Sequence, residues 1–194
     1  MNSKLLPVTA CLVAGGKSSR MGRDKASVHF QETPLWRHQL KTLSAIAPAE
    51  ILVSGRPGAG YDECRYPIIE DHVHQAGPLG GITALLEAAS QPLVAVLAID
   101  MPLMTPKYLT KLIAKCGEST GVVPERAGFF EGLAAVYPRA ALAVAQKSLE
   151  SDDHSIQQFV RSCHDAGLLR ITPVDPADAR LFHSLNTPGD LENL

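Results

Sequence analysis

The run Leu93–Ile99 (LVAVLAI) is the most continuous apolar stretch of the 194-residue sequence. Successive side chains of a β-strand point to opposite faces of a sheet, so a strand in which every side chain is apolar needs a cover on both faces. Such a strand is typical of the centre of a sheet that carries helices on both sides. The run therefore predicts a layered α/β fold, with Asp100 directly after its central strand.

Shorter apolar runs alternate with amphipathic segments along the rest of the chain. A short apolar run bounded by turn residues is typical of a strand, whereas apolar residues at helical spacing are typical of a helix. We expect strands at 9–13, 51–53, 67–70, 121–124, 133–137 and around Ile171, and helices at 34–46, 79–89, 106–116, 139–149, 155–166 and after Thr187. This order predicts one domain over residues 1–194, a three-layer α/β sandwich with a mainly parallel, doubly wound, Rossmann-like sheet.

The charge balance of the chain gives no general attraction for polyanions. It has 18 Lys and Arg, 20 Asp and Glu and a formal net charge of −2, without the basic patch that nucleic acids or anionic membranes require. No apolar run approaches the length of a membrane span, and residues 1–7 lack the apolar core of a signal peptide. The four cysteines are scattered without a CxxC pair, which favours reduced thiols. We therefore expect a cytoplasmic protein that binds neither nucleic acid nor membrane.

Small or acidic residues follow four of the expected strands. They are Gly15 and Gly16 after the first strand, Ser54 after the second, Asp71 after the third and Asp100 after the central one. Ligands of open parallel sheets bind at the carboxyl ends of the strands. These four strand ends therefore predict the edge of the sheet at which a ligand binds.

The first of these strand ends opens a glycine-rich loop, Val13–Lys25 (VAGGKSSRMGRDK). Glycine lets the backbone approach a ligand closely and turn its amides toward phosphate oxygens. The loop also carries the cations Lys17, Arg20, Arg23 and Lys25. It has neither the GxxxxGK[ST] spacing of a P-loop nor the GxGxxG of a dinucleotide-binding loop. The pattern indicates a phosphate-binding loop, with a solvated loop and incidental basic residues as the alternative.

Two further strand ends carry residues suited to a nucleotide. Asp100 is well placed to hold Mg²⁺, a hard cation that prefers oxygen ligands, although a turn-capping aspartate is the alternative. Glu70-Asp71 precedes a second glycine-rich segment at 77–81 (GPLGG). The backbone amides and carbonyls of such a segment are able to read a base edge, although a simple turn before a helix is the alternative.

These segments belong to a series of short motifs that spans nearly the whole chain. The motifs are Ala14-Gly15-Gly16, Ser19-Arg20-Met21-Gly22, Asp24-Lys25, Pro34-Leu35, Glu70-Asp71, Gly77-Pro78-Leu79 with Gly81-Ile82, Asp100-Met101-Pro102 and Asn186-Thr187-Pro188. In type and order they resemble the signature of molybdenum cofactor guanylyltransferases.

The resemblance implies transfer of GMP from GTP to the molybdopterin form of the molybdenum cofactor, with Mg²⁺ as cofactor and release of pyrophosphate. It makes Lys25, Arg20 and Asp100 catalytic, with Asp100 as the metal ligand, and it places Asn186 on the acceptor side. It also implies partner proteins of cofactor biosynthesis or molybdoenzyme maturation. The nucleotide-binding residues that it implies are Val13, Ala14, Gly15, Gly16, Gly22, Lys25, Ser54, Asp71, Gly77, Leu79, Gly80 and Asp100.

Two positions depart from the family pattern. Ser54 stands where asparagine is common, and Gly132 stands where proline is common. The alternatives are a related nucleotidyltransferase that uses CTP or another acceptor, and a non-catalytic nucleotide-binding module. The presence of Lys25 and Asp100 argues against the module, because binding alone does not need a metal-ligating aspartate.

Overall fold

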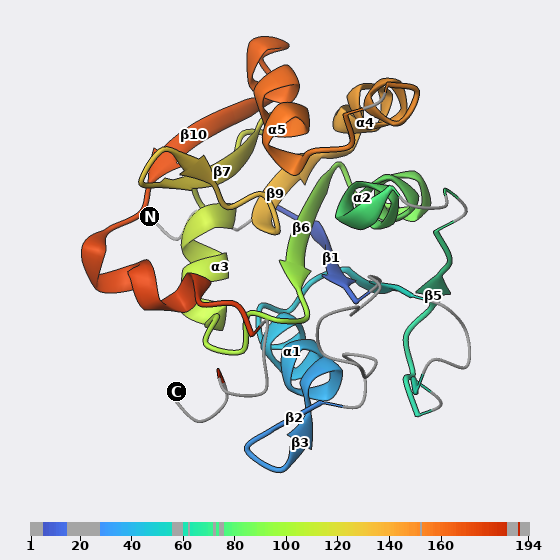
Figure 1. Ribbon diagram of the computed structural model, residues 1–194, viewed down its shortest axis with the longest axis vertical. Helices are drawn as coiled ribbons and strands as arrows, with labels where there is room; N and C mark the ends of the chain where they lie inside the picture. The colour runs from blue at the N-terminus through green and yellow to red at the C-terminus, as the bar shows by residue number, and fades with distance from the viewer. Residues whose placement is uncertain are drawn as a thin grey trace.

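The computed structural model describes residues 6–14, 28–55, 60–61, 63–71, 73, 76–151, 153–185 and 190. Within these residues, eight strands form one sheet, and helices cover both of its faces (Figure 1). The strands are β1 (Val8–Val13), β4 (Glu50–Ser54), β5 (Ile68–Ile69), β6 (Leu93–Ala98), β7 (Gly121–Arg126), β8 (Phe129–Phe130), β9 (Ala134–Pro138) and β10 (Leu169–Pro173), with β2 (His29–Phe30) and β3 (Thr33–Pro34) in a separate hairpin. The helices are α1 (Leu35–Ser44), α2 (Gly77–Ala88), α3 (Pro106–Ile113), α4 (Leu142–Leu149) and α5 (Ile156–Asp165), with 3₁₀ segments η2 (Arg139–Ala141) and η3 (Pro176–Phe182).

The first strand of the chain, β1, lies in the interior of the sheet, beside the central strand β6. The strand order is β10-β7-β9-β6-β1-β4-β5, with β8 paired to β7. β1 pairs in parallel with both β4 and β6, β4 with β5, and β10 with β7, whereas β9 is antiparallel to its two neighbours. The predicted mainly parallel, doubly wound sheet is therefore confirmed, with β9 as the reversed strand in its interior.

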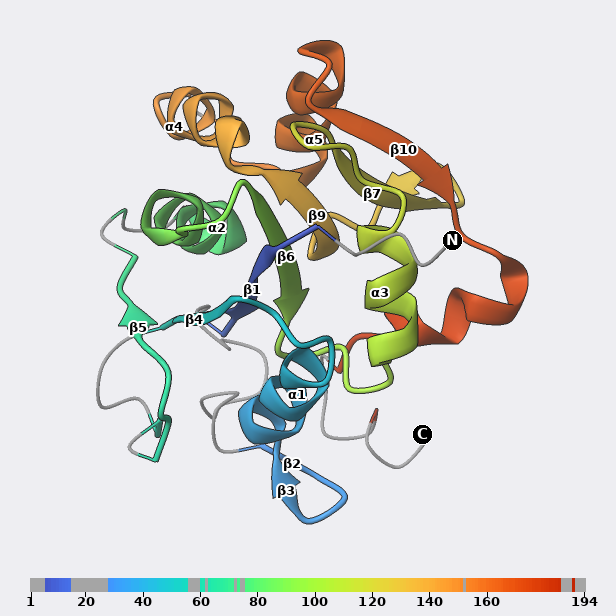
Figure 2. The ribbon, with the colours of Figure 1, turned by 180° about the vertical axis from the view of Figure 1, so that it is seen from behind.

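The helices lie in two layers, with α1 and α3 on one face of the sheet and α2, α4 and α5 on the other (Figures 1 and 2). The side chains of β6 alternate between these layers. Leu93, Ala95 and Leu97 belong to the apolar cluster of α1 and α3, and Val94 and Val96 belong to the cluster of α2, α4 and α5. The prediction from the LVAVLAI run, a central strand covered on both faces, is confirmed.

Most of the predicted elements are present, with a few local differences. The helix expected at 139–149 is divided into η2 and α4, and the strand expected at 67–70 is the short β5. The β2–β3 hairpin, β8 and η3 were not predicted, since two-residue strands and 3₁₀ turns carry little periodicity. The helix expected after Thr187 falls largely outside the described residues.

Candidate active site

The carboxyl ends of four neighbouring parallel strands lie at one edge of the sheet. Val13, the last residue of β1, pairs with Ser54 of β4 on one side and with Ala98 of β6 on the other, and Ser54 pairs with Ile69 of β5. The chain after β1 leads to α1 on one face, and the chain after β5 leads to α2 on the other (Figure 1). Where the connections after nearby strands of an open α/β sheet lead to opposite faces, a ligand-binding crevice forms at the strand ends.

Backbone hydrogen bonds fix the points at which the loops leave this edge. The N–H of Ala14 donates to the carbonyl of Ser54 at 3.1 Å, and the N–H of Ile99 donates to the carbonyl of Val13 at 3.0 Å. The N–H of Gly55 donates to the carbonyl of Ile69 at 3.1 Å. The parallel ladder therefore continues one residue past the strands, so the loops begin from defined positions.

The start of the glycine-rich loop is also held by a buried tyrosine. The hydroxyl of Tyr61 donates to the carbonyl of Ala14 at 3.2 Å, and its ring packs edge-on against Trp36 with the ring centroids 6.0 Å apart. The remaining loop residues predicted for the site, Gly15, Gly16, Arg20, Gly22 and Lys25, lie outside the described residues. The structure therefore fixes the place at which the loop starts.

Asp100 lies in the turn that follows β6, as predicted, and its Oδ1 atom is buried. The N–H of Leu185 donates to the backbone carbonyl of Asp100 at 2.8 Å. This bond brings a segment from the C-terminal part of the chain to the edge that carries β1 and β6. Asn186 is the next residue in the sequence and lies outside the described residues.

The first turns of α2 pack tightly beneath Asp71 and Ser54. A Cβ atom on Gly80 would lie 2.1 Å from Oδ2 of Asp71, and one on Gly81 would lie 2.6 Å from Oγ of Ser54. Oδ1 of Asp71 accepts the N–H of Val73 at 2.9 Å, and the N-terminal end of a helix attracts an anion such as this carboxylate. The glycines therefore allow the second glycine-rich segment to approach two of the strand ends directly.

Three of the predicted nucleotide-site residues are buried in ways that limit what their side chains contact. Ser54 is fully buried, and its Oγ finds no hydrogen-bond partner among the described residues. The side chain of Leu79 lies in the core with α4 and α5, and that of Val13 lies in the same cluster. Val13 and Leu79 therefore offer only backbone atoms to a ligand, and the direct contact of Ser54 stays a prediction.

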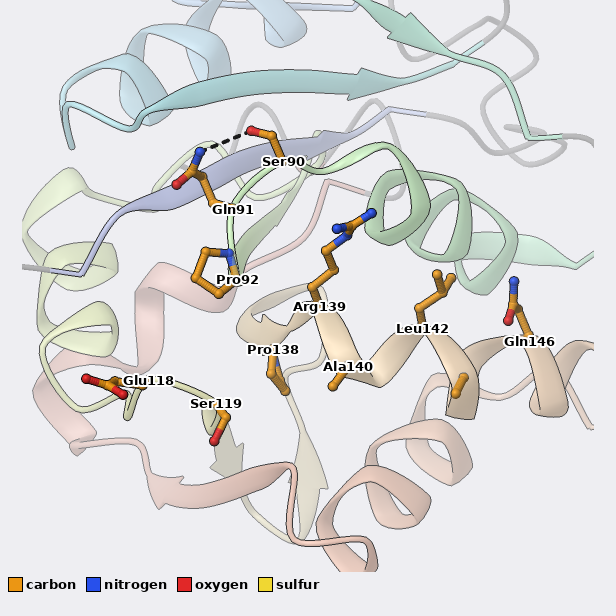
Figure 3. A pocket seen from close by; sticks show the side chains of 11 residues that line it. Ser90, Gln91, Pro92, Glu118, Ser119, Pro138, Arg139, Ala140, Leu142 and Gln146 are labelled. Atoms are coloured by element: carbon orange, nitrogen blue, oxygen red, sulfur yellow. Dashed lines mark hydrogen bonds between the residues drawn. The ribbon is translucent and has the colours of Figure 1, made fainter.

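A cavity of about 640 Å³ lies at the opposite edge of the sheet (Figure 3). Its lining includes the residues just before β6 and just after β9, two strands that run in opposite directions and pair Leu93 with Pro138. Beside it, burial raises the pKa of Glu50, but hydrogen bonds from Ser90 and Thr9 outweigh this effect and lower the pKa below its usual value. The cavity contains none of the predicted site residues, so it is separate from the strand-end site.

Residues 10–167 match the family described as the MobA-like NTP transferase domain. The chain belongs to this family. The relatives of this MobA-like chain include the "Probable molybdenum cofactor guanylyltransferase" of Opitutus terrae, 30% identical over 98% of this chain and 96% of the relative. The "Molybdenum cofactor guanylyltransferase" of Syntrophotalea carbinolica is 33% identical over 95% of this chain and 89% of the relative. The resemblance that the sequence motifs indicated is therefore confirmed.

A solved structure shows the same fold. The "Molybdopterin-guanine dinucleotide biosynthesis protein A" of Archaeoglobus fulgidus superposes on this MobA-like chain with a TM-score of 0.76 at 22% identity, over 95% of each chain.

None of the helices in the part of the chain that the structure describes is long and apolar enough to cross a bilayer.

The described residues of the MobA-like site fit a magnesium ion that is shared with a substrate. Asp100 supplies a carboxylate at the strand-end edge, and within the described ranges no three His, Cys, Asp or Glu side chains gather into a metal site. Mg²⁺ in nucleotide sites is commonly held by one or two carboxylates together with substrate phosphates. The Asp100 carboxylate at the strand-end edge is able to serve as such a ligand.

Proposed function

We propose that this protein transfers GMP from GTP to the molybdopterin form of the molybdenum cofactor, with release of pyrophosphate. The two relatives named above carry the corresponding enzyme name and match nearly the whole chain. The observation that carries the proposal is the pairing of Val13 with Ala98. Because these residues end neighbouring strands, the glycine-rich loop and the Asp100 turn begin side by side, as a triphosphate and its metal require.

In the proposed reaction, a terminal phosphate oxygen of the acceptor attacks the α-phosphorus of GTP in line. A new O–P bond forms, the bond from the α-phosphorus to the bridging oxygen breaks, and its electron pair leaves with pyrophosphate. The attacking phosphate is already ionised near neutral pH, so the step needs no general base from the protein. The protein then contributes positioning and neutralisation of negative charge.

The residues of the loop and the strand ends divide these tasks. Lys25 and Arg20 would neutralise charge on the α-phosphoryl group and on the leaving pyrophosphate, while the amides of the glycine-rich loop hold the triphosphate. Asp100 would hold Mg²⁺, which when bound supplies further charge neutralisation on the phosphates. Asn186 would contact the acceptor or the metal, since it follows Leu185, whose N–H donates a hydrogen bond to the backbone carbonyl of Asp100.

The second glycine-rich segment would recognise the nucleoside. Asp71 and the backbone of Gly77 and Gly80 lie at the strand-end edge on the α2 side, where a guanine and its ribose are expected. We further propose that residues 1–194 act as one nucleotidyltransferase domain in the cytoplasm, alongside other proteins of cofactor biosynthesis or molybdoenzyme maturation.

GTP is expected to be the preferred nucleotide over CTP and ATP. A site with fixed donors and acceptors rejects a wrong base because buried polar groups lose their partners. The measurement is pyrophosphate release with each nucleotide in the presence of Mg²⁺, with and without molybdopterin. Turnover with CTP equal to or faster than that with GTP contradicts the guanylyl assignment. Nucleotide binding without pyrophosphate release, in the presence of the acceptor, would identify a binding module.

Gly80→Ala is expected to weaken GTP binding about tenfold without loss of stability. Alanine in a helix interior is favoured over glycine by about 1 kcal/mol, which offsets a modest steric cost. The new methyl group would displace the Asp71 carboxylate, because a Cβ at position 80 lies 2.1 Å from its Oδ2. The measurements are the Kd for GTP by calorimetry and the melting temperature of the free protein.

The double variant with Asp71→Ala is the control for this mechanism. If the methyl group acts by moving Asp71, the two substitutions share one effect, and the double variant should bind GTP about as weakly as Asp71→Ala alone. Additive losses, or an unchanged Kd in Gly80→Ala, would show that the approach of Gly80 to Asp71 does not serve nucleotide binding.

A further inference from the structure

Gln39 is a fully buried polar residue of α1 whose amide reaches across to the Asp100 turn. Its Nε2 donates to the carbonyl of Ala98 at 3.0 Å and to the carbonyl of Met101 at 2.8 Å. Ala98 is the last residue of β6, and Met101 directly follows Asp100. One side-chain amide therefore joins the two ends of the turn that carries Asp100.

The chemistry of these bonds fixes the orientation of the Gln39 amide. Both partners are carbonyl oxygens, which only accept, so the nitrogen with its two N–H groups must face them. Ala98 and Met101 are themselves almost completely shielded from solvent. The carbonyl of Met101 also accepts the N–H of Met104 at 3.1 Å, so it keeps one donor when the amide is removed. The buried carbonyl of Ala98 loses the bond from Gln39 at a desolvation cost that water does not offset, so the turn is expected to rearrange at this end.

Neighbouring residues of α1 extend the same connection. Nε2 of His38 bonds to the carbonyl of Pro102 at 2.9 Å, and the acceptor makes this nitrogen the donor. At the start of the helix, the N–H of Leu35 donates to the carbonyl of Val28 at 2.8 Å. Val28 lies three residues after Lys25 in the sequence. The helix α1 therefore connects the chain that leaves the glycine-rich loop with the turn that carries Asp100.

We infer that Gln39 is a positioning residue that holds the Asp100 carboxylate where it binds the metal of the nucleotide complex. The inference rests on the proposed function. A metal shared between one protein carboxylate and substrate phosphates depends on the placement of that carboxylate, because the protein supplies few other ligands. Residues that orient a metal ligand through hydrogen bonds commonly change metal affinity by about 10- to 100-fold when they are replaced.

The test replaces Gln39 with methionine, which keeps the length of the side chain and removes both donors. Thr42→Val is the matched control, because Thr42 is a second buried polar residue on α1, and no hydrogen bond joins it to the 98–102 turn among the described residues. The readouts are the affinity for Mn²⁺ of the complex with GTP, by electron paramagnetic resonance of the free ion, the Mg²⁺ concentration that gives half-maximal activity, and the melting temperature.

Gln39→Met is expected to raise the Mn²⁺ Kd and the half-maximal Mg²⁺ concentration by about tenfold. At saturating Mg²⁺ its KM for GTP should stay within about threefold of the wild-type value. Thr42→Val, which changes a buried polar side chain of the same helix, should leave both metal readouts unchanged. Metal readouts of Gln39→Met within twofold of wild type, or an equal change in Thr42→Val, overturn the inference.

A second variant covers the outcome in which Gln39→Met does not fold. Gln39→Asn keeps the amide on a shorter side chain that cannot span both carbonyls, and we expect an intermediate loss of Mn²⁺ affinity. Unchanged affinity in Gln39→Asn then overturns the inference. The proposed function is judged separately by the wild type: absence of pyrophosphate release with GTP and molybdopterin rejects the reaction, whereas the Mn²⁺ comparison still decides the role of Gln39.

Discussion

Lys25→Ala is expected to lower kcat by about 10²-fold or more while the Kd for GTP changes much less. In the proposed reaction, negative charge grows on the α-phosphoryl oxygens and on the departing pyrophosphate. A cation placed at these oxygens stabilises the transition state more than the ground state, so its removal acts mainly on the rate. The measurements are steady-state pyrophosphate release at saturating Mg²⁺ and GTP binding by calorimetry.

Lys17→Ala is the control within the same loop. It removes the same charge from a position that the family resemblance constrains less, so we expect a milder effect on kcat. A Lys25→Ala enzyme with an unchanged kcat and a raised KM would show that Lys25 contributes only to ground-state binding. Equal losses of rate in both variants would point to the net charge of the loop instead of a specific contact.

The layer architecture follows from the sequence because burial on both faces leaves a clear pattern. The uninterrupted LVAVLAI run alone indicates a central strand, and in the structure its alternate residues belong to the two apolar clusters of the two helix layers. The short β2–β3 hairpin carries no such pattern. Its turn places Gln31 and Glu32 at positive φ. Neither residue type favours this conformation, so the sequence does not indicate the turn.

The meeting of the strand ends at one edge was predictable because topology determines where parallel strands end. Ser54, Asp71 and Asp100 lie at or just after the ends of separate strands. The pairing of Val13 with Ser54 and Ala98, and of Ser54 with Ile69, brings these strand ends to one edge. Packing between the loops was not predictable. The approach of Gly80 to Asp71 depends on the exact path of α2 beneath the strand ends, which sequence spacing does not contain.

Gln39 is a buried polar residue that belongs to none of the sequence motifs of the site. It lies four residues after Leu35 and four before Leu43, so the helical period places it on the apolar face of α1. A polar residue on such a face needs a hydrogen-bond partner, so its position in the sequence indicates that a partner exists. Its partners are backbone carbonyls some 60 residues away in the sequence, at Ala98 and Met101, and only the fold reveals them.

The packing around Gly132 gives a structural reason for its departure from the family pattern. A Cβ atom there would lie 2.5 Å from Cγ2 of Ile156 and 2.9 Å from the hydroxyl oxygen of Tyr137. That hydroxyl donates to the carbonyl of Gly132 at 2.7 Å. The departure from the common proline therefore accompanies the close packing of α5 and β9 against this residue.

Asp100→Asn is expected to lower activity by about 10²-fold or more and to abolish the Mg²⁺-dependent stabilisation of the protein by GTP. The substitution keeps the size of the side chain and a carbonyl oxygen, but it removes the negative charge that binds a hard divalent cation. Because the Oδ1 atom is buried, water is a poor substitute for the lost attraction. The measurements are pyrophosphate release over a range of Mg²⁺ concentrations and melting curves with and without GTP and Mg²⁺.

The melting temperature without ligand separates a metal-binding role of Asp100 from a structural one. Asparagine serves turn positions as well as aspartate does, and the turn is held by backbone bonds and by Gln39, so the free variant should melt close to the wild type. Normal turnover at limiting Mg²⁺ would make Asp100 structural and direct the search for the metal ligand elsewhere. If Asp100→Asn does not fold, Asp100→Glu keeps the charge on a longer side chain, and a raised Mg²⁺ requirement in that variant supports the same ligand role.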